Sequence, residues 1–312
     1  MSDGNEILHE TLRKLACLYQ GHGLVPGVIS KIGLKPQWTV VIGTHQQCGI
    51  AINFTGIHNS QKLPKPDLAL IKALVGQSLF EAAGEQMGSE QMYRNSIGVA
   101  ALSALSQPLL TPDSLAERGF KVWPSPDFLE RVLTPTDVVT LIGFGGMVQR
   151  LVGICKELHV TDMRPRGSFL TTIVGREIEY GPRSVFVHAA EENEALLRRS
   201  DVVLITASAL VNRTFVDLLR YASDARALGV YGPSASFIPD VLFDRGIHFV
   251  MSHHVQDPAR FENDMENAMD MESALRSHQK HQTILREKDS AWQAPPCPTL
   301  SPKSGERREW GR

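Results

Sequence analysis

The hydrophobic and polar positions follow two different patterns along the chain. In residues 5–20 the apolar side chains recur at helical spacing, which predicts an amphipathic helix. Three short apolar runs follow, separated by glycine and polar residues as in an antiparallel meander: GVISKIGL, QWTVVIG and CGIAINFTG. Residues 67–107 return to a helical pattern. A helix, a meander and further helices predict a small N-terminal α+β domain.

After a proline-rich stretch, apolar runs recur with helical segments between them. The runs are DVVTLIG, ELHVTD, SVFVHA, DVVLITA, ALGVYG and IHFVMS. Because their apolar residues follow one another without polar alternation, they predict strands buried on both faces, and therefore a parallel sheet covered by helices. Their succession predicts a doubly wound, Rossmann-like domain. The segment 263–288 favours one or two terminal helices.

The two patterns divide the chain into four parts. We predict an α/β protein in which residues 1–108 form the small α+β domain and residues 135–290 form the doubly wound Rossmann-like parallel-sheet domain. Prolines mark residues 109–134 as a linker. Residues 291–312 are rich in proline, serine and charge, which predicts a disordered tail.

Composition and charge narrow the classes of function. With 42% hydrophobic and 21% charged residues, the chain is expected to form a packed globular protein. A formal net charge of −2 offers no broad basic field for nucleic acid or an anionic membrane. No apolar run reaches the roughly 18 residues of a membrane span, and the start, MSDGNEILHE, lacks the order of a secretory signal. We therefore expect a cytoplasmic protein. The 4 cysteines include no CxxC pair, so a thiolate zinc site is not indicated.

A glycine turn follows the first run of the predicted Rossmann-like domain. It reads Gly143-Phe144-Gly145-Gly146, and Gln149 stands three residues after Gly146, so the dinucleotide fingerprint G-x-G-x-x-G is incomplete. Small residues before a helix N-terminus favour a ligand close to the backbone. The alternative is a turn needed only for tight packing of strand against helix. Because the fingerprint is broken, we expect a ligand without a diphosphate.

An acidic residue ends the second run. Asp162 lies 19 residues after Gly143, about the spacing at which a carboxylate accepts hydrogen bonds from ribose hydroxyls. This favours an adenosyl cofactor, with S-adenosylmethionine preferred over NAD because it has no diphosphate. The alternative is a solvated loop residue or a turn cap.

Two further strand-end loops carry small polar residues. Thr206, Ser208 and Asn212 follow the fourth run and are candidates for a polar rim that hydrogen-bonds a ligand. The alternative is that Ser208 or Asn212 is a helix N-cap, and one residue can have both roles. Ligands of open α/β sheets bind beyond the carboxyl ends of the strands, so we predict that these loops and Asp162 converge on a pocket between the two domains. We predict that the rigid turn after the fifth run, with Gly232, Pro233 and Ser234, lines the same pocket.

Three histidines and one cysteine suggest a metal site. His253 and His254 follow the sixth run, while His45 and Cys48 lie three residues apart in the small domain, a spacing at which both can bind one metal. Adjacent histidine rings diverge, so one ring of the pair would join His45 and Cys48. The sequence therefore predicts a transition metal as a second possible cofactor. Histidines at the surface or at caps are the alternative.

With these residues in view, the chain resembles a prokaryotic family described as "putative heavy-metal chelation", over most of residues 5–260. The segments that carry the resemblance are WTVVIGTHQQCGIAINFTG, NSIGVAALSALSQ, DVVLITASALVNRTFVDLL and GVYGPSASFIPDVLFDRGIHFV. The resemblance implies an enolase-N-terminal-like domain followed by a Rossmann-like domain, with the site in the cleft between them. The family-like positions are Thr206, Asn212, Thr214, Gly232, Pro233, Ser234 and Pro239.

The chain departs from the family pattern in three places. Ser103 stands where asparagine is usual, GFGGM replaces a turn more often written with Phe-Pro, and MSHHVQDP carries two histidines where small residues are usual. The first and third departures touch the predicted cleft. The ligand or the reaction is therefore expected to differ from that of typical members.

Three functions follow as hypotheses. The first is a small-molecule-binding protein or enzyme with its site in the interdomain cleft, linked to heavy-metal chelation or chelator metabolism. The second is an enzyme, a transferase or lyase, that uses S-adenosylmethionine or another adenosyl cofactor on a small polar metabolite. The third is a non-catalytic binding or scaffolding protein, because no triad or acid–base pair is identified. The small-residue helix 96–106 also suits packing between subunits, which predicts a homo-oligomer.

Overall fold

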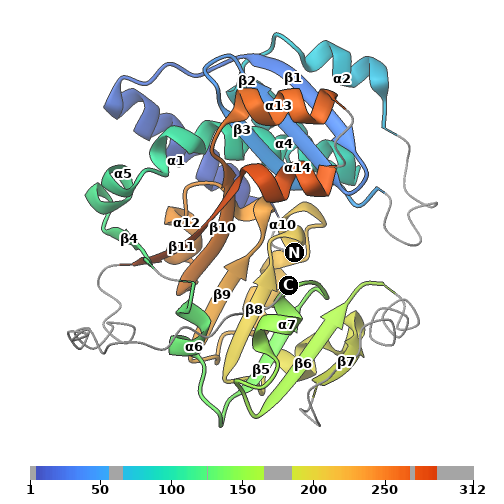
Figure 1. The fold of residues 1–312 in the computed structure, drawn as a ribbon, viewed down its shortest axis with the longest axis vertical. Helices are drawn as coiled ribbons and strands as arrows, with labels where there is room; N and C mark the ends of the chain where they lie inside the picture. Colours follow the sequence, from blue (N-terminus) through green and yellow to red (C-terminus); the bar gives the residue numbers. More distant parts are fainter. Residues whose placement is uncertain (1–4, 56–65, 125, 165–184, 268–270, 287–312) are drawn as a thin grey trace, which may run out of the picture.

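The computed structural model describes residues 5–55, 66–124, 126–164, 185–267 and 271–286. Two sheets organise these residues, a small one and a large one (Figure 1). The small sheet is 3-stranded and antiparallel, in the order β1-β2-β3, and it confirms the predicted meander. Its strands are β1 (Ile29–Lys35), β2 (Trp38–Gly43) and β3 (Cys48–Ile52).

The helices of the N-terminal region share one apolar cluster with the small sheet. They are α1 (Glu6–His22), α2 (Leu68–Leu74), α3 (Leu79–Gln86) and α4 (Met92–Ser106), followed by the 3-10 turn η2 (Gln107–Leu109). Helix α4 is buried along almost its whole length. A Cβ built on Gly49 of β3 would lie 1.8 Å from the carbonyl oxygen of Ala100, so sheet and helix meet backbone to backbone. The small residues of α4 therefore pack inside the chain, and the homo-oligomer stays a prediction without their support.

The large sheet is 8-stranded, in the order β4-β11-β10-β9-β8-β5-β6-β7. From β5 to β10 the strands pair in parallel, and their order is that of the Rossmann fold. The order reverses between β5 and β8, which makes this the switch point of the sheet. The parallel strands are β5 (Val138–Ile142), β6 (Glu157–Asp162), β7 (Val185–Ala189), β8 (Val202–Thr206), β9 (Ala227–Tyr231) and β10 (Phe249–Val255).

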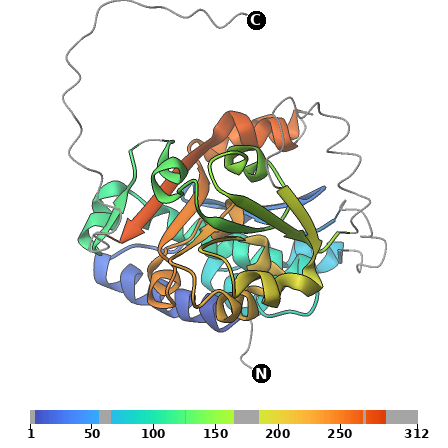
Figure 2. The same cartoon turned by 90° about the horizontal axis from the view of Figure 1, so that it is seen from below.

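Helices cover both faces of the large sheet, which confirms the predicted doubly wound α/β fold (Figure 2). Two separate clusters of buried apolar side chains, one on each face, hold these layers together. One face carries α6 (Phe128–Val132) and α7 (Met147–Leu151). The other carries α9 (Asn193–Leu197), α10 (Ser208–Val211), α11 (Phe215–Tyr221) and α12 (Asp240–Asp244), with the 3-10 turns η3 (Ala190–Glu192) and η4 (Pro233–Ala235) at strand ends.

The C-terminal segment differs in part from the prediction. Helices α13 (Pro258–Glu266) and α14 (Met271–His278) are present, but the helical prediction for the end of segment 263–288 is wrong, because Gln279–Arg286 forms strand β11. It pairs antiparallel with β10 and buries Ile284 and Leu285. The open edge of β10 offers a ladder of backbone hydrogen bonds, and this outweighs the polar character of the segment.

The predicted linker contains regular elements of its own. Helix α5 (Pro112–Glu117) precedes β4 (Phe120–Val122), which pairs with β11 at the edge of the large sheet. The domain boundaries drawn from the sequence stay a prediction, and residues 291–312 lie outside the described residues. Within the described ranges, no helix combines the length and the apolar character that crossing a membrane requires.

Hydrogen bonds join the N-terminal region to η4 and α10, which follow β9 and β8 of the large sheet. The Ile52 N–H donates to Ser234 Oγ at 3.0 Å, and the Asn95 amide donates to the carbonyl of Val211 at 2.6 Å. On the other face of the small sheet, Phe261 of α13 joins the apolar cluster of β2 and β3. The small sheet therefore lies between α4 and α13, against the carboxyl ends of β8 and β9.

Candidate functional site

The glycine turn lies at the end of β5, at the switch point. Gly143 has a φ of 97°, and a Cβ built on it would lie 3.0 Å from the Cβ of Thr206 and 3.1 Å from the Tyr231 hydroxyl oxygen. That hydroxyl donates to the carbonyls of Ile142 and Gly143, 2.9 and 2.8 Å away. Burial raises the pKa of Tyr231, so the phenol remains a donor. Glycine is therefore required at position 143 by the packing of β5, β8 and β9.

The next two glycines lie in more open surroundings. Among the described residues, no heavy atom lies within 4 Å of a Cβ built on Gly145 or Gly146. Helix α7, which follows them, has 5 residues, so its dipole contributes less than the sequence suggested. Room for a ligand at this turn comes from bare backbone rather than from a helix end.

Asp162, at the end of β6, is saturated with hydrogen bonds. It accepts from the Phe144 N–H at 2.8 Å, and from the backbone N–H, Nε and Nη2 of Arg164 at 2.9 Å each. Arg164 also donates to the Phe144 carbonyl at 2.7 Å. A carboxylate offers about four acceptor positions, and all of them are filled. Asp162 therefore ties the loop after β5 to the loop after β6, and a ribose hydroxyl would have to displace Arg164.

The loop after β8 is also built on internal hydrogen bonds. Ser208 Oγ donates to Thr206 Oγ1 at 3.0 Å. Asn212 Oδ1 accepts from the hydroxyl of Thr214 at 2.7 Å, and its amide nitrogen contacts the sulfur of Met163 at 2.8 Å. Neither Ser208 nor Asn212 caps a helix through its side chain. The Asn212–Met163 contact brings the loop of β8 against the loop that begins at Asp162.

The turn after β9 meets the small sheet. Gly232 has a φ of 110°, and Pro233 then begins η4. Ser234 is 2% exposed and accepts the hydrogen bond from Ile52. Ser234 therefore lies in the contact between the two sheets. A role for Ser234 in binding a ligand stays a prediction, and so do the ligand-binding roles of the other residues at the strand ends.

The four predicted metal ligands do not fit a common site. His45 is exposed in the turn between β2 and β3, whereas Cys48 is buried in the apolar cluster with Phe261. Burial raises the pKa of the Cys48 thiol, which disfavours the thiolate that a metal requires. His253 and His254 are adjacent in β10 and project to opposite faces. In the part of the chain that the structure describes, no group of three or more His, Cys, Asp or Glu side chains is arranged to hold a metal ion.

His253 instead pairs with a histidine of β11. The rings of His253 and His281 lie 4.1 Å apart at 90°. Burial, then His281 and Arg150, lower the pKa of His253 to about 3. Among the described residues, its Nδ1 atom is buried without a hydrogen-bond partner. This pair is therefore held neutral among positively charged neighbours.

A second histidine pair was missed from the sequence. His159 of β6 and His188 of β7 approach to 3.0 Å between Nδ1 and Nε2. His159 Nε2 lies 3.3 Å from Glu157 Oε2, and His188 Nδ1 lies 2.9 Å from Glu192 Oε2. Burial lowers the pKa of His159, and the hydrogen bond from His159 lowers that of Glu157. In the sequence both histidines look like polar interruptions of apolar runs. Their meeting depends on the register of β6 and β7.

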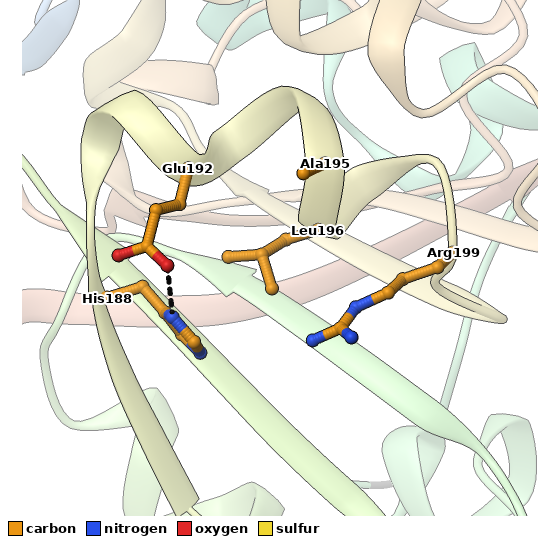
Figure 3. Close-up of a pocket in the computed structure, with 5 residues that line it drawn as sticks. All are labelled: His188, Glu192, Ala195, Leu196 and Arg199. Carbon is orange, nitrogen blue, oxygen red and sulfur yellow. Dashed lines mark hydrogen bonds and ion pairs between the residues drawn. The ribbon is translucent and has the colours of Figure 1, made fainter.

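A cavity of about 390 Å³ lies beside this pair (Figure 3). In Figure 3 the Glu192 side chain extends from η3 to the ring of His188, while Arg199 approaches from the end of α9. The lining residues are His188, Glu192, Ala195, Leu196 and Arg199.

Solved structures of DUF364 proteins resemble the chain. A solved structure from Desulfitobacterium hafniense, of a DUF364 protein of unknown function, is 21% identical, with a TM-score of 0.63 over 88% of this chain and 98% of that one. A DUF364 protein of unknown function from Pyrococcus horikoshii is 16% identical, with a TM-score of 0.63 over 89% and 99%. At these identities the likeness shows the fold. No curated protein matches the chain.

Two family models match the two parts of the chain. Residues 21–106 match DUF4213, and residues 127–283, half of the chain, match DUF364; both carry the description "putative heavy-metal chelation". The chain therefore belongs to the DUF364 family.

Proposed function

We propose that the chain binds a small polar molecule at the switch point of the large sheet, and that this molecule belongs to heavy-metal chelation chemistry. The observation that carries the proposal is the open backbone of Gly145 and Gly146, next to the tightly packed Gly143. It lies at the strand ends where sheets of this order bind ligands. The family description supports the link to chelation.

The side chains around the turn suit an organic ligand better than a bare heavy-metal ion. Thr206 and Ser208 are half-buried and carry hydroxyl groups. Soft and borderline metals prefer thiolate and imidazole ligands to hydroxyl groups. A molecule that hydrogen-bonds these hydroxyls and supplies its own metal-binding groups matches this lining. The proposed ligand is therefore a chelator or a chelator precursor.

An adenosyl cofactor is the second candidate, with S-adenosylmethionine preferred over NAD. The glycine turn after the first strand of a Rossmann order favours it. The saturated carboxylate of Asp162 opposes it, because a ribose would have to break the ion pair with Arg164. A chelator without a ribose does not have to break this ion pair.

Calorimetric titration of the untagged chain tests both candidates. We expect heat of binding with a small metal chelate, for which the Zn²⁺ complexes of citrate and histidine are the first probes. Gly145→Val should weaken that binding about tenfold or more by filling the open space with a side chain, at a cost of about 1.4 kcal/mol per tenfold. Gly21→Ala, at another glycine with open surroundings, is the matched control. No heat of binding with S-adenosylmethionine, NAD and NADP would exclude the adenosyl cofactor. No heat of binding with any chelate would contradict the proposed chelate site.

A further inference from the structure

Strands β6 and β7 place two imidazole rings side by side at the edge of the large sheet, with their centroids 5.2 Å apart and their planes tilted by 41°. The register pairs Thr161 with His188, so the side chains of His159 and His188 project on the same face. Helix α9 covers that face, where Thr161 Oγ1 donates to Asn193 at 2.6 Å. His159 Nδ1 and His188 Nε2 are 3.0 Å apart. The two nitrogens that face one another are called the inner nitrogens below.

Each outer nitrogen of the pair faces a carboxylate. His159 Nε2 lies 3.3 Å from Glu157, and His188 Nδ1 lies 2.9 Å from Glu192. An ionised carboxylate only accepts hydrogen bonds, so both outer nitrogens must carry a proton to make them. In neutral rings the inner nitrogens are then bare and only 3.0 Å apart, so their lone pairs repel one another. A positive ion bound to both nitrogens removes this repulsion.

The spacing of the inner nitrogens is close to that of two ligands on one metal ion. Tetrahedral zinc with Zn–N bonds of about 2.0–2.1 Å holds two nitrogens about 3.3 Å apart. Carboxylates on the outer nitrogens are the arrangement that orients metal-binding histidines and raises their basicity. We propose that His159 Nδ1 and His188 Nε2 bind one transition-metal ion of the Zn²⁺ class, held in place by Glu157 and Glu192.

The cavity gives this site access and an open coordination sphere. His188 lines it, with 16% of its side chain exposed, whereas His159 is 4% exposed. Two protein ligands leave positions for water or for a small co-ligand. Arg199 approaches the outer nitrogen of His159 at 3.5 Å and lines the same cavity, so an anionic co-ligand suits it. This site shares no residue with the switch point and does not rest on the proposed function.

Titration of the full-length protein with Zn²⁺ by calorimetry, and with Co²⁺ by visible absorption, tests the site. We expect His188→Gln to remove one bound Zn²⁺ and the corresponding Co²⁺ bands. Glu157→Gln should keep the site and weaken it about 10–100-fold, because it removes an orienting carboxylate. Glu194→Gln is the matched control, since the exposed Glu194 of α9 pairs with Arg198, the residue that follows this helix.

His159→Phe gives a second variant that keeps the ring stacked on Phe186, 5.0 Å away, in case a smaller residue unfolds the strand. Equal Zn²⁺ binding in the wild-type chain and in all variants would overturn the proposal. So would nitrogen NMR spectra that show a proton shared between the inner nitrogens at saturating Zn²⁺. Either result leaves the Gly145→Val comparison, and with it the proposed function, unaffected.

Discussion

The switch point and the β6–β7 edge differ in the partners of their polar groups. At the switch point, Asp162 is saturated with hydrogen bonds from within the chain, and the Tyr231 hydroxyl bonds two carbonyls. Open space there is provided by glycine backbone. At the edge, the outer nitrogens of two rings face carboxylates, and their inner nitrogens lie 3.0 Å apart. A recognisable loop can therefore be mainly structural, while ligand-binding groups can come together where the sequence shows no motif.

The largest effect on stability is expected at Gly143. Gly143→Ala introduces a Cβ 3.0 Å from Thr206 at a φ of 97°. We expect a loss of about 2–4 kcal/mol in the free energy of unfolding, from backbone strain and overpacking together. Gly145→Ala should stay within about 0.5 kcal/mol of the wild type. Urea denaturation measures both, and equal losses would remove the distinction between packed and open glycines.

Asp162→Ala is expected to act on stability first. It removes the ion pair with Arg164 and leaves the Phe144 N–H without its acceptor. The free energy of unfolding should fall by about 1–3 kcal/mol. If Asp162 served mainly to bind a ribose, the substitution would weaken ligand binding and leave the urea midpoint unchanged. That outcome would favour the adenosyl cofactor. Glu191→Ala, an exposed acid on η3, provides the control.

The His253–His281 pair shares its residue type with the edge pair, but its surroundings are cationic. The folded pKa of His253, about 3, lies below the roughly 6.5 of an unfolded histidine. The unfolded chain then binds more protons between these values, so this contribution to stability is complete above about pH 6.5 and declines as the pH falls. The slope should reach up to about 1.4 kcal/mol per pH unit. His253→Phe should flatten that slope in urea melts between pH 4 and 7, and an unchanged slope would contradict the assignment.

The smallest effect is expected at the contact between the two sheets. Ser234→Ala removes the acceptor of the Ile52 N–H, a partly buried hydrogen bond of 3.0 Å. The loss should be about 0.5–1.5 kcal/mol in the free energy of unfolding. Hydrogen exchange at the Ile52 amide gives the local readout. Unchanged protection in Ser234→Ala would mean that this bond does not hold the small sheet.

The sequence predicts much of the fold because burial leaves a pattern in it. Strands covered on both faces are continuous apolar runs, and each run from DVVTLIG to IHFVMS became a strand. The sequence did not indicate strand β11, because the strand begins with the polar residues QKHQ. Its pairing with β10, not its composition, makes this segment a strand. Edge strands depend on partners that are distant in the sequence.

The site is harder to predict from the sequence, because most of its contacts also join residues that only the fold brings together. The glycine turn is local, so its position was predicted correctly at the end of a strand. The Asp162–Arg164 pair depends on how one loop folds back, and the His159–His188 pair depends on strand register. The metal prediction from His45 and Cys48 used spacing alone, and the two side chains differ in burial: one is exposed and the other lies in an apolar cluster.

The native mass spectrum of the untagged chain shows whether the open glycines of the switch point receive a small molecule. We expect the wild-type chain and Gly21→Ala to carry the same added small-molecule mass, and Gly145→Val to lose it while keeping its fold. An identical added mass on Gly145→Val would mean that the molecule binds elsewhere. A wild-type chain without added mass, which also fails to take up any chelate offered to it, would mean that this turn binds none.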